Sequence, residues 1–209
     1  MKDRAVVTAG TGGIGLEVAR ELARRGYAVT VVGRDERRGA EAAESIGADA
    51  LFVRADLSSL EEVRTLGARL AAQGPLRLLV NNVGGMAVSG RAKLAHLAAV
   101  LELAERLRDT GISVFAADPG AAATPNAAEM EPEILPPPLR PHWDAVRQGV
   151  QRPVREAIGS IVHAATAPGL ETGTVFGPDL APADALTAPL TPELAAAARR
   201  LTESVLREG

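Results

Sequence analysis

Short apolar runs alternate with helical patterns along most of this chain, and that alternation limits the folds it can adopt. The apolar runs are RAVVTA (4–9), YAVTVVG (27–33), ALFVRA (50–55), LRLLVN (76–81), ISVFAA (112–117) and TGTVFG (172–177). The segments between the first five runs carry apolar residues at helical spacing. Strands that alternate with helices form parallel sheets covered on both faces. We therefore predict an α/β fold with one doubly wound parallel sheet of about six strands.

Capping residues and glycines predict where the helices begin and end. The first helix should follow the glycine-rich loop and stop at Gly26, and Ser58 or Ser59 can cap the third. Thr191 and Pro192 are typical of the start of a final helix. Pro153 suits a first helical turn. The remaining helices are expected over about 35–46, 59–73, 90–109, 143–151 and 154–166.

The length of 209 residues, with 46% hydrophobic content, is sufficient for one sizeable core. We expect a single domain, 1–209. Residues 1–120 should form its core, 121–170 a proline-rich lid with the substrate segment, and 171–209 the last strand and C-terminal helix.

Charge and composition argue against several classes of partner. The net charge is −3 and the arginines are scattered among carboxylates, so nucleic acid is not an expected partner. The absence of cysteine excludes disulfides and thiolate metal sites, and three isolated histidines do not form a metal site. No leader-like or membrane-length apolar run is present. We expect a cytoplasmic protein that does not contact a membrane.

The loop TAGTGGIG, residues 8–15, lies between the first predicted strand and helix. Gly10, Gly12 and Gly15 fit G-x-G-x-x-G, which lets backbone amides and a helix N-terminus approach a pyrophosphate. Asp35 follows about 20 residues later and could bond a ribose hydroxyl. Arg34 beside it, with Arg37 or Arg38, could instead pair with a 2′-phosphate. A glycine-rich turn before a solvated helix remains the alternative.

Four motifs in this order resemble the short-chain dehydrogenase/reductase family. TAGTGGIG is similar to its T-G-x-x-x-G-I-G loop, with Ala9 in place of the first glycine, and ADL (55–57), NNVG (81–84) and PGAAAT (119–124) resemble its next three motifs. The C-terminal third is similar to bacterial retinol-dehydrogenase-like members. The resemblance implies a Rossmann-type fold that binds a nicotinamide cofactor, and Arg34 favours NADP(H) over NAD(H). The implied cofactor-binding residues are Thr8, Gly10, Thr11, Gly12, Gly13, Ile14, Gly15, Arg34, Asp35, Asp56, Leu57, Asn82, Gly84, Lys93, Pro119, Gly120 and Thr124.

The implied catalytic centre departs from the family pattern. After NNVG the family has a helix, a strand ending in a catalytic serine, and then Y-x-x-x-K. Here SGRAK follows almost at once, so that Lys93 matches the lysine and Ser89 stands at the tyrosine. The only tyrosine, Tyr27, begins the second predicted strand. A serine hydroxyl is a much weaker acid than a phenol, and general acid help of this kind contributes roughly 10²–10⁴-fold. Lys93, Ser89 and Asn82 are the expected catalytic residues of a weakened centre.

The histidines and the tryptophan offer further candidates. His96 follows Lys93 by one helical turn and could act as an acid, although a packed or solvated histidine is the commoner case. His142 and Trp143 could touch a substrate from the lid, or Trp143 could anchor the lid. We interpret His163 as structural.

Three functional hypotheses follow. The first is an NADP(H)-dependent oxidoreductase acting on a small carbonyl or alcohol compound. The second is a non-redox enzyme of the same fold, such as a cyclase, dehydratase or isomerase. The third is a non-catalytic partner or an NADP(H)-responsive regulator. A homodimer, or a heteromer with a catalytic homologue, is compatible with each.

Overall fold

The computed structural model describes residues 2–83, 90–135 and 137–208. The chain forms two compact units. The first comprises Met1–Met86 and Ala121–Ile158, and the second comprises Ala87–Gly120 and Gly159–Gly209. The predicted lid segment is therefore divided between them after Ile158.

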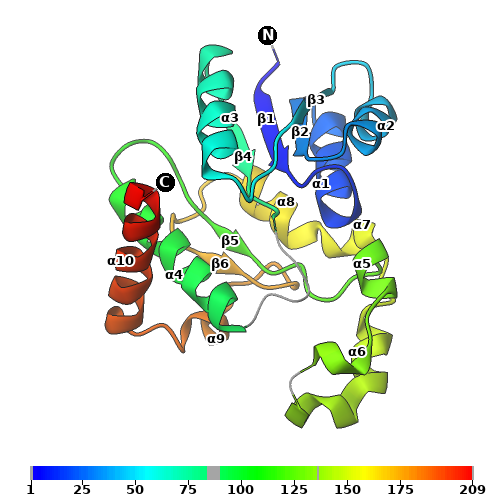
Figure 1. The fold of residues 1–209 in the computed structure, drawn as a ribbon, viewed down its shortest axis with the longest axis vertical. Helices are drawn as coiled ribbons and strands as arrows, with labels where there is room; N and C mark the ends of the chain where they lie inside the picture. The colour runs from blue at the N-terminus through cyan, green and yellow to red at the C-terminus, as the bar shows by residue number, and fades with distance from the viewer. Residues whose placement is uncertain (1, 84–89, 136, 209) are drawn as a thin grey trace. The chain divides into compact units, whose positions relative to one another are not determined.

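A four-stranded parallel sheet forms the centre of the first unit (Figure 1). Its strands, in the order β3-β2-β1-β4, are β1 (Arg4–Thr8), β2 (Ala28–Gly33), β3 (Leu51–Arg54) and β4 (Leu78–Val80). Val7 lies beside Val31, which lies beside Phe52, so these three side chains share one face of the sheet. The first four predicted strands and their parallel arrangement are confirmed.

Helices cover both faces of this sheet, as a doubly wound fold requires (Figure 1). Helices α1 (Gly13–Arg24) and α2 (Glu36–Ile46) lie on one side, and α3 (Leu60–Ala72) lies on the other. Leu66 and Leu70 of α3 belong to a buried cluster that also includes Val6, Val32 and Val53. On the opposite face, Gly39 of α2 lies directly against the Phe52 ring.

Local signals fix the ends of these helices. The Ser59 hydroxyl accepts a hydrogen bond from Glu62 N at 3.3 Å and caps α3. Gly26 follows α1 with a φ of +92°, and Tyr27 N donates to Leu22 O at 3.1 Å. Such a left-handed residue is a common helix end and favours glycine. The predicted stop at Gly26 and the choice of Ser59 as cap are confirmed.

The proline-rich part of the first unit folds into short helices: α5 (Pro125–Ala128), η1 (Pro132–Ile134), η2 (Pro137–His142), α6 (Trp143–Gly149) and α7 (Val154–Ala157). The backbone of Ala123 donates to Arg152 O at 2.8 Å and joins the two ends of this excursion. Ala157 is buried, and α7 packs against α1. The predicted continuous helix over 154–166 is wrong, because α7 ends at Ala157 and a separate helix follows. Pro153 caps α7 rather than entering its first turn.

The second unit contains α4 (Gly90–Arg106), β5 (Ala116–Ala117), α8 (Gly159–Thr166), β6 (Val175–Phe176), α9 (Asp184–Thr187) and α10 (Pro192–Glu208). Helix α10 packs along α4, with Arg199 Nε 3.7 Å from Glu102 Oε1. The Thr191 hydroxyl accepts from Leu194 N at 3.2 Å, which confirms the predicted cap.

The predicted six-stranded sheet is wrong in its arrangement. Among the described residues, four strands form one sheet and β5 pairs with β6 in a separate parallel pair. Both strands are only two residues long, because the backbone before β5 forms hydrogen bonds outside the strand pair. Val114 N donates to Thr172 Oγ1 at 3.0 Å, and Val114 O accepts from Gly173 N at 2.8 Å. Along these described stretches, no helix is long and apolar enough to cross a membrane.

Candidate cofactor site

The glycine-rich loop joins the carboxyl end of β1 to the first turn of α1. A Cβ atom on Gly10 would lie 2.8 Å from Val31 Cγ1, and one on Gly15 would lie 2.5 Å from both Ala9 O and Asn82 Nδ2. Both positions therefore require glycine for close packing. Gly13 and Gly15 carry no side chains in the N-terminal turn of α1, which suits an anionic group.

Two threonines hold the loop against the neighbouring strands. Thr8 is buried, and its hydroxyl accepts from Asn82 N at 3.0 Å at the end of β4. A Cβ atom on Gly33, at the end of β2, would lie only 2.7 Å from the Thr11 methyl. The loop is thus fixed between β2 and β4, and the Asn82 amide lies over Gly15 inside the first unit.

Arginines at the start of α2 flank the loop, but they differ in their surroundings. The Arg38 guanidinium lies 2.9 Å from where a Cβ on Gly12 would be. Arg34 is exposed and acts electrostatically on Asp56. Among the described residues, neither of these side chains has a hydrogen bond or ion pair with the protein. Arg37 instead pairs with Glu41 at 2.8 Å, and its predicted contact with a phosphate stays a prediction.

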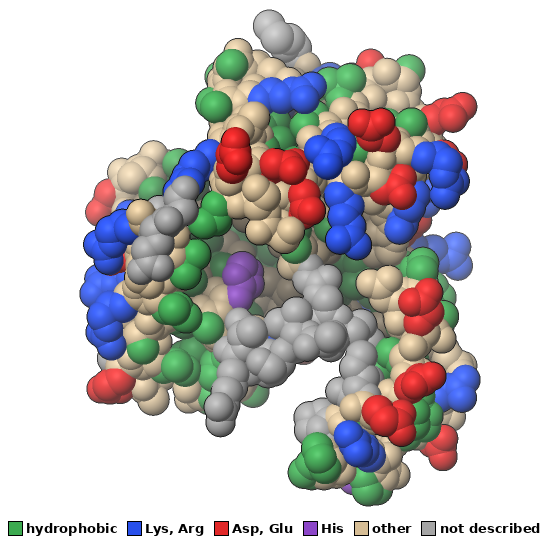
Figure 2. Space-filling view, in the orientation of Figure 1, with side chains coloured by type: hydrophobic (Ala, Val, Ile, Leu, Met, Phe, Trp, Pro, Cys, Tyr) green, Lys and Arg blue, Asp and Glu red, His purple; other side chains and the backbone are tan. Residues whose placement is uncertain are grey.

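Asp35 caps α2 rather than standing free beside the loop. Its Oδ1 accepts from Arg38 N at 2.9 Å. The carboxylate therefore fixes the turn that carries Arg34 and Arg38, and its predicted bond to a ribose hydroxyl stays a prediction. Across the face seen in Figure 2, basic and acidic side chains are interspersed rather than gathered by sign.

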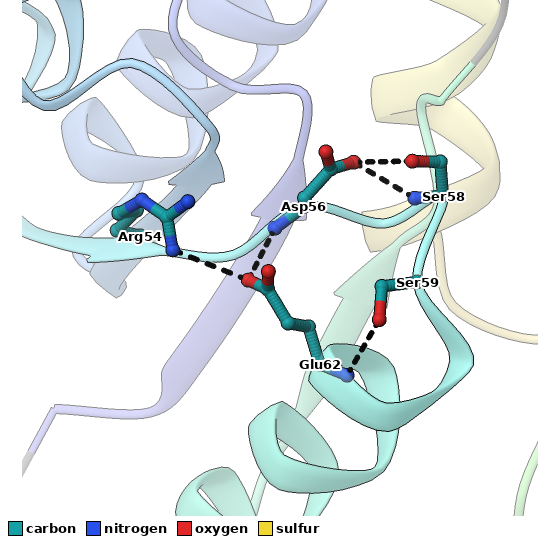
Figure 3. A network of polar contacts seen from close by, with 5 residues as sticks. All are labelled: Arg54, Asp56, Ser58, Ser59 and Glu62. Atoms are coloured by element: carbon teal, nitrogen blue, oxygen red, sulfur yellow. Dashed lines mark hydrogen bonds and ion pairs between the residues drawn. The ribbon is translucent and has the colours of Figure 1, made fainter.

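A polar network surrounds Asp56 between β3 and α3 (Figure 3). Asp56 Oδ1 accepts from Ser58 N at 3.0 Å and from Ser58 Oγ at 2.7 Å. These bonds, with smaller contributions from Arg34 and Arg54, lower the pKa of the Asp56 carboxyl below its ordinary value. The carboxylate is therefore held ionised, in one orientation, on the same unit as the glycine loop.

Glu62 completes this network, and the sequence prediction omitted it. Its Oε2 accepts from Asp56 N at 2.9 Å and lies 3.3 Å from Arg54 Nη1. The spacing of Ser59 and Glu62 fits the S-x-x-E pattern in which a glutamate reaches back to the chain before a helix. That pattern could have identified Glu62 from the sequence. Leu57, by contrast, packs against the buried cluster beneath α3.

Thr124 lies beside the loop within the first unit. Its Cγ2 is 3.5 Å from where a Cβ on Gly13 would be, and its hydroxyl accepts from Ala127 N at 3.1 Å to cap α5. Gly13 itself has a φ of +53°. Next to this contact is a shallow pocket of about 330 Å³, lined by Gly13, Leu16, Glu17, Pro125, Pro153, Val154 and Arg155. Ile14, in the first turn of α1, is half-buried.

The other predicted site residues lie elsewhere. Lys93 is exposed on α4 in the second unit, as is His96 one turn later. Pro119 and Gly120 also belong to the second unit, where Gly120 has a φ of +68°. Gly84 and Ser89 lie outside the described residues. Because Asn82 and Lys93 fall in different units, a catalytic centre shared by Asn82, Ser89 and Lys93 stays a prediction.

The tyrosine, the other histidines and the tryptophan lie outside the glycine loop and the Asp56 network. Tyr27 precedes β2 at its amino end, whereas the glycine loop follows the carboxyl end of β1. His163 stacks edge-on against Phe176, with ring centroids 5.1 Å apart, in agreement with a structural role. His142 is exposed and Trp143 is half-buried in the proline-rich segment. Within the described residues, no cluster of three potential metal-binding side chains occurs.

Comparison with known proteins finds a family likeness in the N-terminal part of the chain. Residues 3–97, which contain the glycine loop, the Asp56 network and Lys93, match the family model described as short chain dehydrogenase. Over these residues the chain is similar to the short-chain dehydrogenase family. The resemblance inferred from the sequence motifs is thereby confirmed.

Two curated relatives and one solved structure illustrate the likeness. Polyprenol dehydrogenase of Mus musculus is 49% identical over 88 residues, which are 39% of this chain and 26% of the relative. The NADPH-dependent 1-acyldihydroxyacetone phosphate reductase of Saccharomyces cerevisiae is 42% identical over 87 residues, 40% of this chain and 29% of the relative. The matched segment thus spans under a third of either relative. The RhlG/NADP active-site complex of Pseudomonas aeruginosa shares the fold, with a TM-score of 0.69, 22% identity, and coverage of 84% of this chain and 94% of that chain.

Proposed function

We propose that this chain is a short-chain dehydrogenase that binds NADP(H) in preference to NAD(H), and that its first unit holds the adenine half of the cofactor. The observation that carries the proposal is a pair of arginine side chains beside the glycine loop for which the described part of the chain offers no hydrogen bond or ion pair. Arg38 lies over Gly12, and Arg34 lies within electrostatic reach of Asp56. Arginine is well suited to phosphate recognition.

The residues of the first unit fit the parts of this cofactor. The loop around Gly10 and Gly15, with the start of α1, would hold the pyrophosphate. Arg34 and Arg38 would hold the 2′-phosphate, and Asp56 the adenine ring. Thr124, beside Gly13, and the Pro119–Gly120 turn of the second unit would meet the nicotinamide end. The yeast relative, similar over this same half, is named as NADPH-dependent, which supports the choice.

We further propose an oxidoreductase that acts slowly on a small carbonyl or alcohol compound. Bound NADP(H) supplies or accepts a hydride. Lys93 would bind the cofactor, and Ser89 and Asn82 would donate to the substrate oxygen. With serine in place of a phenol, proton transfer is the weak step. Both named relatives carry out oxidation or reduction by their names, which supports this class.

A non-catalytic NADP(H)-binding protein is the second candidate. The position of Tyr27, the only tyrosine, favours it, because this residue is at the opposite end of the strands from the glycine loop. A non-redox enzyme of the same fold is the third. Substrate turnover distinguishes these candidates. Cofactor binding is required by the oxidoreductase and by the non-catalytic protein, but not by the non-redox enzyme.

The first test is equilibrium binding of NADPH and NADH to the full chain. We expect Arg34→Glu to weaken NADPH by roughly 10–100-fold, the value of one or two charge-assisted bonds, and to change NADH much less. Arg37→Glu is the matched control, because it makes the same charge change on a residue already paired with Glu41. Equal weakening of NADPH and NADH would overturn the phosphate assignment. Failure of both nucleotides to bind the unmodified protein would overturn the cofactor proposal.

The second test asks whether the bound cofactor reacts. NADPH is mixed with the protein and a panel of aldehydes, ketones and quinones while its absorbance is followed. We expect slow oxidation that Lys93→Ala reduces further. Complete inertness of the whole panel, with NADPH binding intact, would favour the non-catalytic candidate.

A further inference from the structure

A buried serine lies in the second unit, on the helix that follows the proline-rich segment. Ser160 is in the first turn of α8, and 1% of its surface is exposed. Its Oγ donates to Asp118 O at 2.8 Å, across 42 residues of sequence. A hydroxyl is costly to bury without such a partner. The hydrogen bond therefore fixes α8 to the residue that directly follows β5.

Asp118 is held at its other polar groups as well. Its backbone N donates to Phe176 O at 2.8 Å, and its Oδ1 accepts from Gly120 N at 2.8 Å. Gly120 has a φ of +68°, a left-handed conformation that favours glycine. With Ser160 on the carbonyl, Asp118 has its backbone and its side chain engaged. The turn Asp118–Pro119–Gly120 is thereby fixed in one conformation.

This turn has the position of a ligand-binding element. It follows the carboxyl end of a parallel strand, where α/β proteins bind their ligands. A turn that contacts a ligand needs support from residues behind it, because small displacements weaken the contact. Ser160 is behind the turn and buried, so it cannot itself reach a ligand.

We propose that Ser160 is a positioning residue for the nicotinamide end of the cofactor. It acts through Asp118, by holding the Pro119–Gly120 turn in the conformation that meets the nicotinamide. This inference rests on the proposed cofactor binding and adds a residue to it. The adenine half is proposed to bind residues of the first unit only, so Ser160 should affect the two halves of NADPH differently.

The test compares two ligands on one variant and one control. We expect Ser160→Ala to weaken NADPH by roughly two- to tenfold, the value of one net hydrogen bond, and to move the fluorescence of bound NADPH toward that of free NADPH. Its affinity for 2′,5′-ADP, which has no nicotinamide, should equal that of the unmodified protein. Thr202→Ala is the control, because Thr202 Oγ1 donates at 2.9 Å to Ala198 O of its own helix, away from the turn.

The outcomes are separable. Equal NADPH affinity and emission in Ser160→Ala and Thr202→Ala would overturn the positioning role and leave cofactor binding intact. Equal loss of NADPH and 2′,5′-ADP in Ser160→Ala would overturn it too, because it would indicate a general loss of structure. If the unmodified protein binds neither ligand, the proposed function fails first. Should Ser160→Ala not fold, Gly120→Ala is the second variant, since a side chain at that φ displaces the same turn, and unchanged NADPH affinity there would also overturn the proposal.

Discussion

Ala9 adopts a φ of +50° at the start of the glycine loop, one of two non-glycine residues with positive φ among those described. It occupies the place where the family pattern inferred from the sequence has its first glycine. The left-handed region costs an L-residue roughly 1–2 kcal/mol. The surrounding packing imposes this conformation, because Ala9 O is directed at Gly15 where α1 begins. The backbone of the loop is therefore strained at Ala9, and the proposed cofactor site does not require alanine at this position.

Replacing Ala9 with glycine should stabilise the protein. Relief of about 1–2 kcal/mol of strain exceeds the roughly 0.4–1 kcal/mol that glycine adds to the entropy of the unfolded chain. We expect the free energy of unfolding in urea to rise by about 0.5–1 kcal/mol. Ala40→Gly, at an exposed helical position in α2, is the control and should lower it by about 0.5–1 kcal/mol. A loss of stability in both variants would show that Ala9 is not strained.

At the scale of elements, the connection between β3 and α3 is organised by carboxylates. Ser59 caps α3, Glu62 reaches back to Asp56 N, and the Asp56 carboxylate accepts two bonds from Ser58 (Figure 3). The connection thus places Asp56 at the carboxyl end of β3, on the edge where the glycine loop follows β1. The two bonds from Ser58 favour the ionised form of Asp56.

The stabilisation that Asp56 gives to the connection between β3 and α3 should therefore decrease at acid pH. The folded pKa of Asp56 lies below the ordinary value of 3.8, chiefly because of the bonds from Ser58. The stabilisation is therefore present above that ordinary value and is lost as the pH falls through the folded pKa. Asp56→Asn keeps an oxygen acceptor for Ser58 but removes the titration. We expect urea unfolding to show a smaller loss of stability between about pH 5 and pH 2 for Asp56→Asn than for the unmodified chain, and parallel profiles would contradict this.

Signals within one segment made several elements predictable from the sequence. Gly26 and Ser59 mark helix ends through bonds to residues only three to five positions away. The pairing of β5 with β6 was not predictable in this way. It depends on Val114 meeting Thr172 and Gly173, which are 58 and 59 residues later in the chain. The proximity of Arg38 to Gly12 likewise requires the fold, because only β2 and α2 together bring that side chain back to the loop.

At the scale of the whole molecule, the candidate cofactor residues are distributed over two compact units. The glycine loop, Arg34, Arg38, Asp56 and Thr124 are in the first, and Lys93, Pro119 and Gly120 are in the second. This division corresponds to the chemistry proposed for each part. The first unit carries the groups suited to phosphates and adenine, together with Thr124, and the second carries the other groups assigned to the nicotinamide end. Ligands that contain only part of the cofactor should therefore affect the units unequally.

Amide hydrogen exchange, followed by mass spectrometry, can measure this inequality. A ligand at 100 times its Kd stabilises what it binds by about 2.7 kcal/mol, enough to slow local opening roughly 100-fold. We expect 2′,5′-ADP to slow exchange in peptides covering 8–15, 34–38 and 54–62 only. NADPH should slow these and also the peptide that contains Gly120, whose N–H bonds Asp118 Oδ1. Both ligands contain the adenine half, so they should protect the first unit alike. Equal protection of the Gly120 peptide as well would mean that the nicotinamide end does not contact the Pro119–Gly120 turn.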